Sequence, residues 1–296
     1  MRIAFVGKGG SGKTTLSALF SKHVAGTKMP VLVFDADLNI HLPELFGFKE
    51  SVSPDIYISR LETRATIRKH LIGSNSNIKE IVDLGKTTLP SEGSNLINIH
   101  NLDKSILKDY SVKEDNLHLV VVGTYEDDRI GKSCYHGNLV IFENILNHLV
   151  DKDGYVVTDM VAGVDAFANT LHAQFDVLAL IVEPTKRSIE VFEHYNHLAK
   201  EGGVHKNLFV IANKIRNESD KDFILNHIPE RQFIGFFNES EYLREIERTS
   251  SPLEISKLEP ENIKLLNMIK DTLEANTEDT EDRFDRIQRL HDRIAL

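Results

Sequence analysis

The chain contains little cysteine: one residue, Cys134, among 296. A single thiol cannot form a disulfide within the chain, so disulfide-stabilised folds of secreted proteins are excluded. A chain of this length can bury a sizeable hydrophobic core instead. We therefore expect a core-stabilised protein in a reducing compartment, and assign it to the cytoplasm.

Long apolar runs are also missing. No stretch approaches the roughly 18 apolar residues that a membrane-spanning helix needs. The first residues, MRIAFVGKGG, lack the pattern of a secretory signal, because the apolar run at residues 3–6 is followed at once by Gly7. The sequence predicts a protein without a membrane segment.

An excess of positive charge is absent as well. The chain has 35 Lys and Arg against 45 Asp and Glu, for a formal net charge of −10. A net-acidic chain is a poor general ligand for nucleic acid or anionic lipid, although a local basic patch could still exist. The charge balance therefore makes no strong case for nucleic acid as a partner, and we expect no membrane partner. With 41% hydrophobic and 27% charged residues, the composition is that of a globular protein and excludes wholesale disorder.

Short apolar runs rich in β-branched residues recur along the chain. Helical patterns separate most of them, notably at residues 139–149 and 189–200. Alternation of this kind predicts an α/β fold, a mainly parallel sheet with helices on both faces, with ligands at the carboxyl ends of the strands. The expected strands are residues 3–6, 31–37, 117–123, 155–160, 177–184 and 207–214.

Two segments depart from this pattern. Residues 49–116 are rich in Ser, Asn and Asp, and we interpret them as an irregular insertion within one domain that spans residues 1–273. Residues 274–296 begin with an acidic linker at 274–282 and end in a helix whose apolar stripe is Phe284, Ile287, Leu290 and Ile294. A basic amphipathic tail would indicate membrane docking. This stripe is flanked by charges of both signs, which favours packing on its own domain or on a partner.

Residues 7–15, GKGGSGKTT, fit the pattern G-x-x-x-x-G-K-[ST] between an expected strand and an expected helix. Glycines at these positions let consecutive N–H groups turn toward phosphate oxygens, and the following helix presents its positive end to the same anion. Lys13 would reach the β- and γ-phosphates, and the Thr14 hydroxyl would ligate Mg²⁺. The predicted nucleotide contacts in this loop are Gly9, Gly10, Ser11, Gly12, Lys13, Thr14 and Thr15.

A second lysine, Lys8, makes the loop K-G-G-x-G-K-T-T. This resembles the deviant Walker A loop of a family of dimeric ATPases that includes septum-site and plasmid-partition proteins, nitrogenase iron protein and nickel-insertion ATPases. The resemblance implies a three-layer P-loop NTPase fold and an ATP-dependent homodimer. It also assigns Lys8 to the partner's nucleotide phosphates, where it would neutralise charge that develops during phosphoryl transfer. The alternative is an ordinary surface lysine in a glycine loop.

Two aspartates close expected strands beside this loop. The family reads D-x-D-x-N where this chain has DADLN, and the resemblance assigns water orientation to Asp37 and a switch role to Asn39 and His41. The family's D-x-x-A-G switch matches DMVAG, so Asp159 would hold Mg²⁺ through water and Gly163 would offer its N–H to the γ-phosphate. An aspartate at a strand end can instead cap a helix. Together with Lys8 and Lys13, Asp37 completes the predicted catalytic set.

Asn213 and Lys214 end the last expected strand and match the position where family members read adenine. A carboxamide offers both a donor and an acceptor to the base edge. The sequence N-K-I-R lacks the aspartate expected for guanine in N-K-x-D, which favours ATP over GTP. Phe236 and Phe237, in the next apolar run, could stack on the base.

Several segments narrow the resemblance to the nickel-insertion ATPases that mature carbon monoxide dehydrogenase: DADLNIHL, GTYEDDRIGKSCYHGN, DMVAGVDAF and VEPTKRSIEV. In those relatives a C-x-C pair from each subunit forms a shared metal site at the dimer interface. This chain has Cys134 and His136 in its place. Two subunits could supply S₂N₂ ligands for Zn²⁺ or Ni²⁺, or Cys134 is an ordinary loop residue without a metal.

Three functions follow as hypotheses. The first is an ATP-dependent dimeric switch that hydrolyses ATP to ADP and phosphate and assembles a metallocentre in an unidentified client enzyme. The second is a partition or positioning ATPase whose cycle controls binding to DNA or membrane; the acidic composition weighs against it. The third, reductase chemistry of the iron-protein kind, needs two cluster cysteines per subunit, and the single cysteine excludes its ordinary version. An ATPase switch with an unknown client also stays open.

Overall fold

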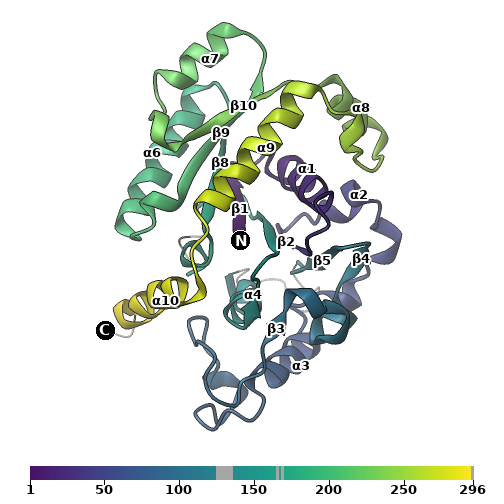
Figure 1. Ribbon diagram of the computed structural model, residues 1–296, viewed down its shortest axis with the longest axis vertical. Coiled ribbons are helices and arrows are strands. Elements are labelled where there is room, and N and C mark those ends of the chain that lie inside the picture. The colour runs from purple at the N-terminus through teal and green to yellow at the C-terminus, as the bar shows by residue number, and fades with distance from the viewer. Residues whose placement is uncertain (125–135, 165–166, 168–169, 295–296) are drawn as a thin grey trace.

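A computed structural model describes residues 1–124, 136–164, 167 and 170–294 (Figure 1). Within these residues an eight-stranded sheet has the order β10-β9-β8-β1-β7-β2-β5-β4. Neighbouring strands are parallel except for the antiparallel pair β4 and β5 at one edge. The strands of this sheet are β1 (Arg2–Gly7), β2 (Val31–Ala36), β4 (Val112–Glu114), β5 (Leu117–Val121), β7 (Tyr155–Met160), β8 (Val177–Val182), β9 (Leu208–Ile215) and β10 (Phe233–Asn238).

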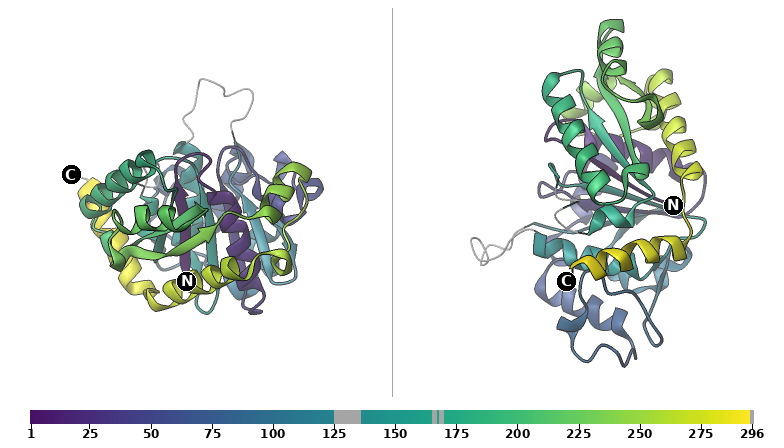
Figure 2. Two further views of the ribbon diagram at one scale, coloured as in Figure 1. Left: turned by 90° about the horizontal axis from the view of Figure 1, so that it is seen from above. Right: turned by 90° about the vertical axis from the view of Figure 1, so that its left-hand side faces the viewer.

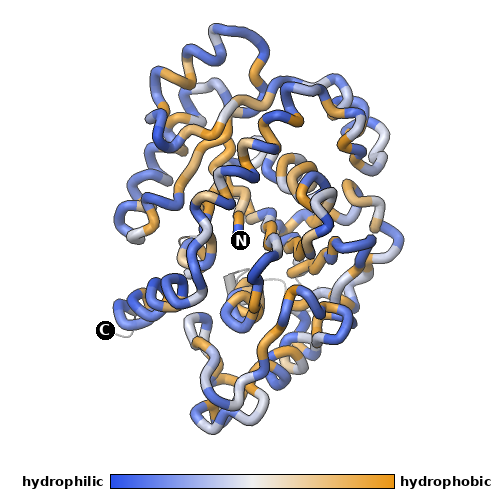
Figure 3. Tube along the Cα trace, in the orientation of Figure 1, coloured by the Kyte–Doolittle hydropathy of each residue, from blue (hydrophilic) through white to orange (hydrophobic). Residues whose placement is uncertain are grey.

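The central strands are buried on both faces. Every residue of β1, β2, β7 and β8 is buried, as expected for parallel strands covered by helices on each side. Figure 3 shows the same distribution, with apolar residues concentrated on these strands and polar residues on the outer helices. Each of the six expected strands overlaps an observed one, and the predicted mainly parallel sheet is confirmed.

Helices cover both faces of the sheet. Buried side chains of α3, α4, α6 and α7 share one hydrophobic cluster with the strands, and those of α1, α2, α8 and α9 share the other. Figure 2 shows α6 and α9 on opposite sides of the sheet. The helices are α1 (Lys13–Ala25), α2 (Leu42–Phe46), α3 (Leu61–Ile72), α4 (His136–Asn147), α6 (Lys186–Glu201), α7 (Glu218–Leu225), α8 (Glu241–Thr249), α9 (Pro260–Ala275) and α10 (Thr280–Ile294).

The segment 49–116 contains α3, short 3₁₀ turns and the two-residue strand β3 (Ile97–Asn98), which pairs in parallel with β6 (Leu149–Val150). Its buried residues Ile58, Ile67 and Leu84 belong to the same cluster as Phe34 of β2. The segment therefore packs onto the central core. Figure 1 shows it gathered around α3 and β3, at the end of the molecule opposite α7.

The C-terminal part of the chain is more helical than the sequence suggests. We expected an acidic linker at 274–282, but α9 continues to Ala275 and α10 begins at Thr280. The Asp279 carboxylate accepts a hydrogen bond from the Asp282 amide at 2.8 Å and caps α10. Acidic residues near the start of a helix are favoured by the helix dipole, so this composition suits a helix start as well as a linker.

Buried ion pairs fix α10 across the end of the sheet where β1 begins. Arg283 contacts Asp151 at 3.2 Å and Asp176 at 3.0 Å, and Arg2 contacts Asp151 at 3.2 Å. The amino group of Met1 lies 3.0 Å from the same Asp151 carboxylate. These guanidinium groups hold the pKa of Asp151 far below its usual range despite burial, which alone would raise it. The chain's two ends are thus joined through charged groups.

Candidate nucleotide-binding site

The loop between β1 and α1 turns sharply at Gly12, the residue before the first turn of α1. Gly12 has φ 99°, a left-handed conformation that favours glycine. A Cβ at this position would lie 2.2 Å from the Asn213 side-chain nitrogen. The Lys13 side chain is buried, and its ammonium donates to the Lys8 carbonyl at 3.4 Å. The loop therefore holds the lysine at the helix start, where the motif places the phosphates.

Asp159 lies beside this loop, at the carboxyl end of β7. It pairs in register with Phe5 of β1 on one side and with Asp35 of β2 on the other. Both aspartates are fully buried, and neither Asp159 carboxylate oxygen accepts a hydrogen bond from the described residues. Burial, followed by the charge of Asp35, raises the pKa of Asp159 well above its usual value, against the opposing effects of Thr14 and Lys13.

These observations fit a cation. A buried carboxylate without hydrogen-bond donors gains most from a positive ion, and carboxylate and hydroxyl oxygens are ligands that Mg²⁺ accepts. The Thr14 hydroxyl is one of the groups that lower the pKa of Asp159, so it acts on the same carboxylate. The donor types of Thr14 and Asp159 are therefore compatible with the predicted magnesium site.

Asp35 was not among the predicted site residues, although it begins the D-x-D pattern. Its carboxylate accepts hydrogen bonds from the amides of Leu42 at 3.0 Å and Asp37 at 3.3 Å. Burial raises the pKa of Asp35 to about 7. Asp35 therefore organises the loop that carries Asp37 and adds negative charge next to Asp159.

Asp37 lies on the loop after β2 and is 7% exposed. Its Oδ1 accepts hydrogen bonds from the backbone and side-chain nitrogens of Asn39, both at 3.0 Å. Both of these hydrogen bonds go to Oδ1, which leaves Oδ2 as the oxygen that could face a water molecule. Asn39 and His41 are exposed, and His41 precedes the first turn of α2.

Gly163 is held against the phosphate loop. Its amide donates to the Gly7 carbonyl at 3.1 Å, and its carbonyl accepts from the Tyr195 hydroxyl. The resemblance suggested that this amide faces the γ-phosphate. In this structure the amide is engaged by the loop itself, so contact with a phosphate would require that hydrogen bond to break.

Asn213 and Lys214 extend from β9 to the phosphate loop. The side-chain Nδ2 of Asn213 donates to the Ser11 carbonyl at 2.7 Å, and its side-chain Oδ1 accepts from the backbone amide of Lys214 at 2.8 Å. The carboxamide that we expected at the adenine edge therefore braces the loop here. The Lys214 ammonium donates to the Gly10 carbonyl at 2.8 Å.

A cavity of about 290 Å³ lies next to this brace, between the phosphate loop, the end of β10 and α8. Its walls combine apolar side chains with polar groups, a lining typical of ligand sites. We consider it the candidate base pocket because it adjoins the loop. Phe237 lines it, whereas Phe236 packs against Phe233 at a ring-centroid distance of 4.8 Å.

Lys8 is placed on its own chain. Its ammonium forms an ion pair with Glu183, directly after β8, and the same carboxylate binds Lys214 at 2.7 Å. Glu183 was not among the predicted site residues, although it stands at the carboxyl end of the expected strand 177–184 and within the family-like segment VEPTKRSIEV.

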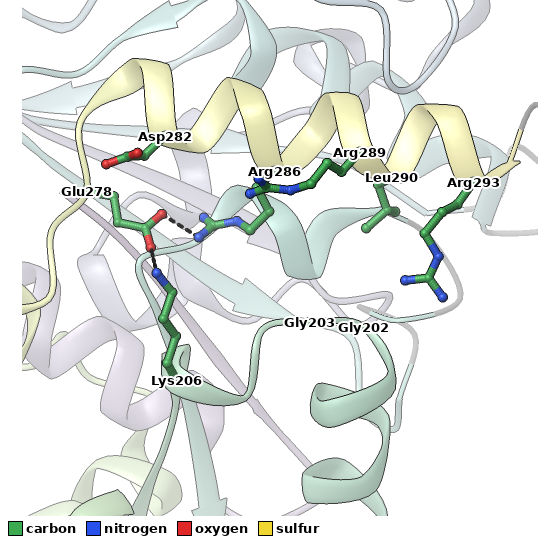
Figure 4. Close-up of a pocket in the computed structure, with 9 residues that line it drawn as sticks. All are labelled: Gly202, Gly203, Lys206, Glu278, Asp282, Arg286, Arg289, Leu290 and Arg293. Carbon is green, nitrogen blue, oxygen red and sulfur yellow. Dashed lines mark hydrogen bonds and ion pairs between the residues drawn. The ribbon is translucent and has the colours of Figure 1, made fainter.

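A second cavity, of about 340 Å³, lies under α10 beside the turn that follows α6 (Figure 4). Glu278 pairs there with Lys206 at 2.8 Å and with Arg286. Arg286 also donates to the Ala173 carbonyl at 2.9 Å. None of the predicted site residues lines this cavity, and these contacts serve to anchor α10.

Of the predicted transition-metal ligands, Cys134 lies outside the described residues, as does the side chain of His136. Within the part of the chain that the structure describes, no group of three or more His, Cys, Asp or Glu side chains could hold a metal ion. Among the same residues, no helix has both the length and the hydrophobicity that a membrane span requires.

The fold and the site define a P-loop nucleotide-binding protein: a glycine loop joins a central parallel strand to a helix, beside two buried aspartates. The chain belongs to the CobQ/CobB/MinD/ParA nucleotide binding domain family, which it matches over residues 3–253. This confirms the family resemblance that the phosphate loop suggested.

Two curated relatives cover most of the chain. An uncharacterized ATP-binding protein of Methanocaldococcus jannaschii is 30% identical over 274 residues, which are 91% of this chain and 97% of that protein. The carbon monoxide dehydrogenase accessory protein CooC of Rhodospirillum rubrum is 26% identical over 237 residues, 79% of this chain and 82% of that protein.

Solved structures share the fold. A ParA family ATPase from Chlorobium tepidum superposes with a TM-score of 0.60 at 17% identity, covering 92% of this chain and 98% of that one. A chain of the MinC:MinD cell division protein complex of Aquifex aeolicus gives 0.59 at 18% identity, covering 94% and 97%. At these identities the likeness concerns the fold alone.

Proposed function

We propose that the protein is an ATP-dependent dimeric switch that hydrolyses ATP to ADP and phosphate. The observation that carries the proposal is the buried, unbonded carboxylate of Asp159 beside the loop that presents Lys13 and Thr14. A buried acid without donors is costly unless a cation joins it, and a Mg²⁺–nucleotide complex supplies that cation.

In this proposal Mg²⁺, held by Thr14 and through water by Asp159, would neutralise charge on the β- and γ-phosphate oxygens. The Lys13 ammonium and the loop amides bind the same phosphates. Oδ2 of Asp37 orients a water molecule, whose oxygen bonds to the γ-phosphorus as the bond to the bridging oxygen breaks. One of the water's protons stays on the phosphate and the other passes to solvent. The products are ADP and inorganic phosphate.

The partner's Lys8 would complete the site in a homodimer. Each subunit would then contribute a cation to the other's nucleotide, so that association depends on the triphosphate. Hydrolysis by the chain alone is expected to be slow, since a switch requires a bound state that persists.

We further propose that the cycle serves metallocentre assembly in a client enzyme, with Cys134 and His136 as the candidate transition-metal ligands. Similarity to a carbon monoxide dehydrogenase accessory protein supports this role. The alternative of a membrane- or DNA-positioning ATPase gains nothing from the C-terminal helix, because Arg283, Arg286 and Ile287 of α10 are buried in the domain.

The test is phosphate release combined with nucleotide binding. Lys13→Ala is expected to abolish binding of Mg·ATP in calorimetry. Asp37→Ala is expected to bind it within severalfold of wild type but to lose hydrolysis by at least about 100-fold, as a water-orienting group should. Matched controls are Lys264→Ala and Asp109→Ala, which change exposed residues of the same types outside the site. Unchanged ATP binding by Lys13→Ala would show that the loop is not the phosphate site.

A further inference from the structure

Glu183 forms ion pairs with two lysines, Lys8 of the phosphate loop and Lys214 near the end of β9. It follows β8 directly and its side chain is 14% exposed. One carboxylate oxygen pairs with the Lys8 ammonium, and the other with Lys214 at 2.7 Å. Burial acts to raise the pKa of Glu183, but the hydrogen bonds from Lys214 and Lys8 outweigh it and lower the pKa. The carboxylate is therefore ionised at neutral pH.

The Lys214 side of this cluster is firmly placed. Its ammonium bridges Glu183 and the Gly10 carbonyl, the latter at 2.8 Å. Its backbone has φ 60°, which is uncommon for a residue other than glycine. The Asn213 side chain holds that backbone by accepting from the Lys214 amide. Lys214 thus connects Glu183 to the phosphate loop, and this connection does not depend on the contact between Lys8 and Glu183.

Lys8 has the weaker attachment. Its side chain is 32% exposed, and Glu183 is the carboxylate it contacts in the described structure. One ammonium cannot remain on its own Glu183 and also reach phosphates bound by another subunit. When Lys8 leaves, Lys214 still neutralises the carboxylate, so no buried charge is left unpaired.

We propose that Glu183 retains Lys8 on its own chain until a partner's nucleotide draws it across the dimer interface. Glu183 is then a positioning residue that opposes association without nucleotide. This rests on the proposed function, because it requires an ATP-dependent dimer. Partly exposed ion pairs typically change an equilibrium constant by up to about fivefold. Each dimer requires two such pairs to break, one in each subunit. The Lys8–Glu183 pairs therefore lower the association constant of the dimer by up to roughly 25-fold.

The test is sedimentation velocity with Mg·AMPPNP as a non-hydrolysable nucleotide. Glu183→Gln removes the charge that retains Lys8, and we expect it to tighten the dimer by more than about twofold and by up to roughly 25-fold. In a Lys8→Ala background the same substitution should change dimerisation by less than twofold. Glu183→Asp keeps the charge and should stay closer to wild type than Glu183→Gln does.

Two controls separate this role from a general effect. Glu190→Gln removes one negative charge from an exposed position on α6 and should leave the dimer unchanged. Calorimetry on each variant in the Lys8→Ala background measures nucleotide affinity without the trans contact, and this affinity should stay within about twofold. Thermal unfolding of Glu183→Gln checks that the fold is intact, and Lys214→Gln shows how much of any stability change comes from the other pair.

The outcomes are distinguishable. If wild type does not dimerise with Mg·AMPPNP, the proposed function is contradicted and the transfer of Lys8 with it. If wild type dimerises but Glu183→Gln brings no gain, or the gain persists without Lys8, the retention of Lys8 by Glu183 is wrong and the dimeric switch stands.

Discussion

The three aspartates of the site differ in how their carboxylates are hydrogen-bonded. Asp35, Asp37 and Asp159 lie on or after neighbouring strands, but only Asp159 lacks donors on both carboxylate oxygens among the described residues. The D-x-D and D-x-x-A-G patterns suggested Asp37 and Asp159. They did not show that the Asp35 carboxylate accepts hydrogen bonds from two backbone amides, because these bonds depend on how the loop after β2 folds back.

Gly12 provides a sharp test of the loop's geometry. Gly12→Ala would place a methyl group 2.2 Å from the Asn213 nitrogen and force alanine into φ 99°. We expect loss of nucleotide affinity by at least about tenfold and a stability loss of about 1–3 kcal/mol from the strained backbone. Calorimetry with Mg·ATP and urea denaturation measure the two effects.

The matched control is Gly9→Ala. A Cβ at Gly9 would have its nearest neighbour, the Ala162 Cβ, at 4.0 Å, and Gly9 does not have a left-handed φ. This variant should keep its stability within about 0.5 kcal/mol. Equal effects of the two substitutions would contradict the brace between Asn213 and the loop.

At the scale of elements, apolar periodicity predicted the strands well because burial on both faces leaves few alternatives. Charged segments were harder to interpret. Acidic residues at 274–282 look like a solvated linker, yet Glu274 binds Tyr155, Glu278 binds Arg286, and Asp279 caps α10. The contact between Glu274 and Tyr155 joins residues 119 positions apart, and local composition carries no record of it.

The anchorage of α10 can be tested by removing one buried cation. Arg283→Met leaves Asp176 with one partner fewer in a buried setting, and breaking such a pair typically costs about 3–5 kcal/mol. Urea denaturation should show a loss of this order. Arg289→Met changes an exposed arginine on the same helix and should cost less than about 0.5 kcal/mol. Similar stability of the two variants would show that α10 contributes little to the fold.

At the scale of the whole molecule, the phosphate loop and the strand pattern were sufficient to predict the fold and the family. They were not sufficient to place Lys8, Asn213 and Gly163. The sequence resemblance directs all three toward nucleotide or partner, whereas in the single chain they contact Glu183, Ser11 and Gly7. Each of these polar groups has a partner within the chain, and motif spacing cannot show such contacts.

The difference between the contacts seen in the single chain and those expected from the resemblance fits the proposed switch, which has a single-chain state and a nucleotide-bound dimer. The single chain retains its own lysine and loop amides, and the nucleotide-bound dimer would redirect them. A nucleotide can favour the dimer only through interactions that the single chain does not make with it. Lys8 is the group that provides this difference in the proposed switch.

The most direct measurement is the sedimentation of Asp37→Ala with Mg·ATP and with Mg·ADP. Asp37→Ala should bind ATP without hydrolysing it, so the ATP state persists through the experiment. We predict a species of twice the monomer mass with ATP and a monomer with ADP, and a monomer in both when Lys8→Ala is added. An unchanged sedimentation coefficient in ATP and ADP would contradict the nucleotide-dependent dimer.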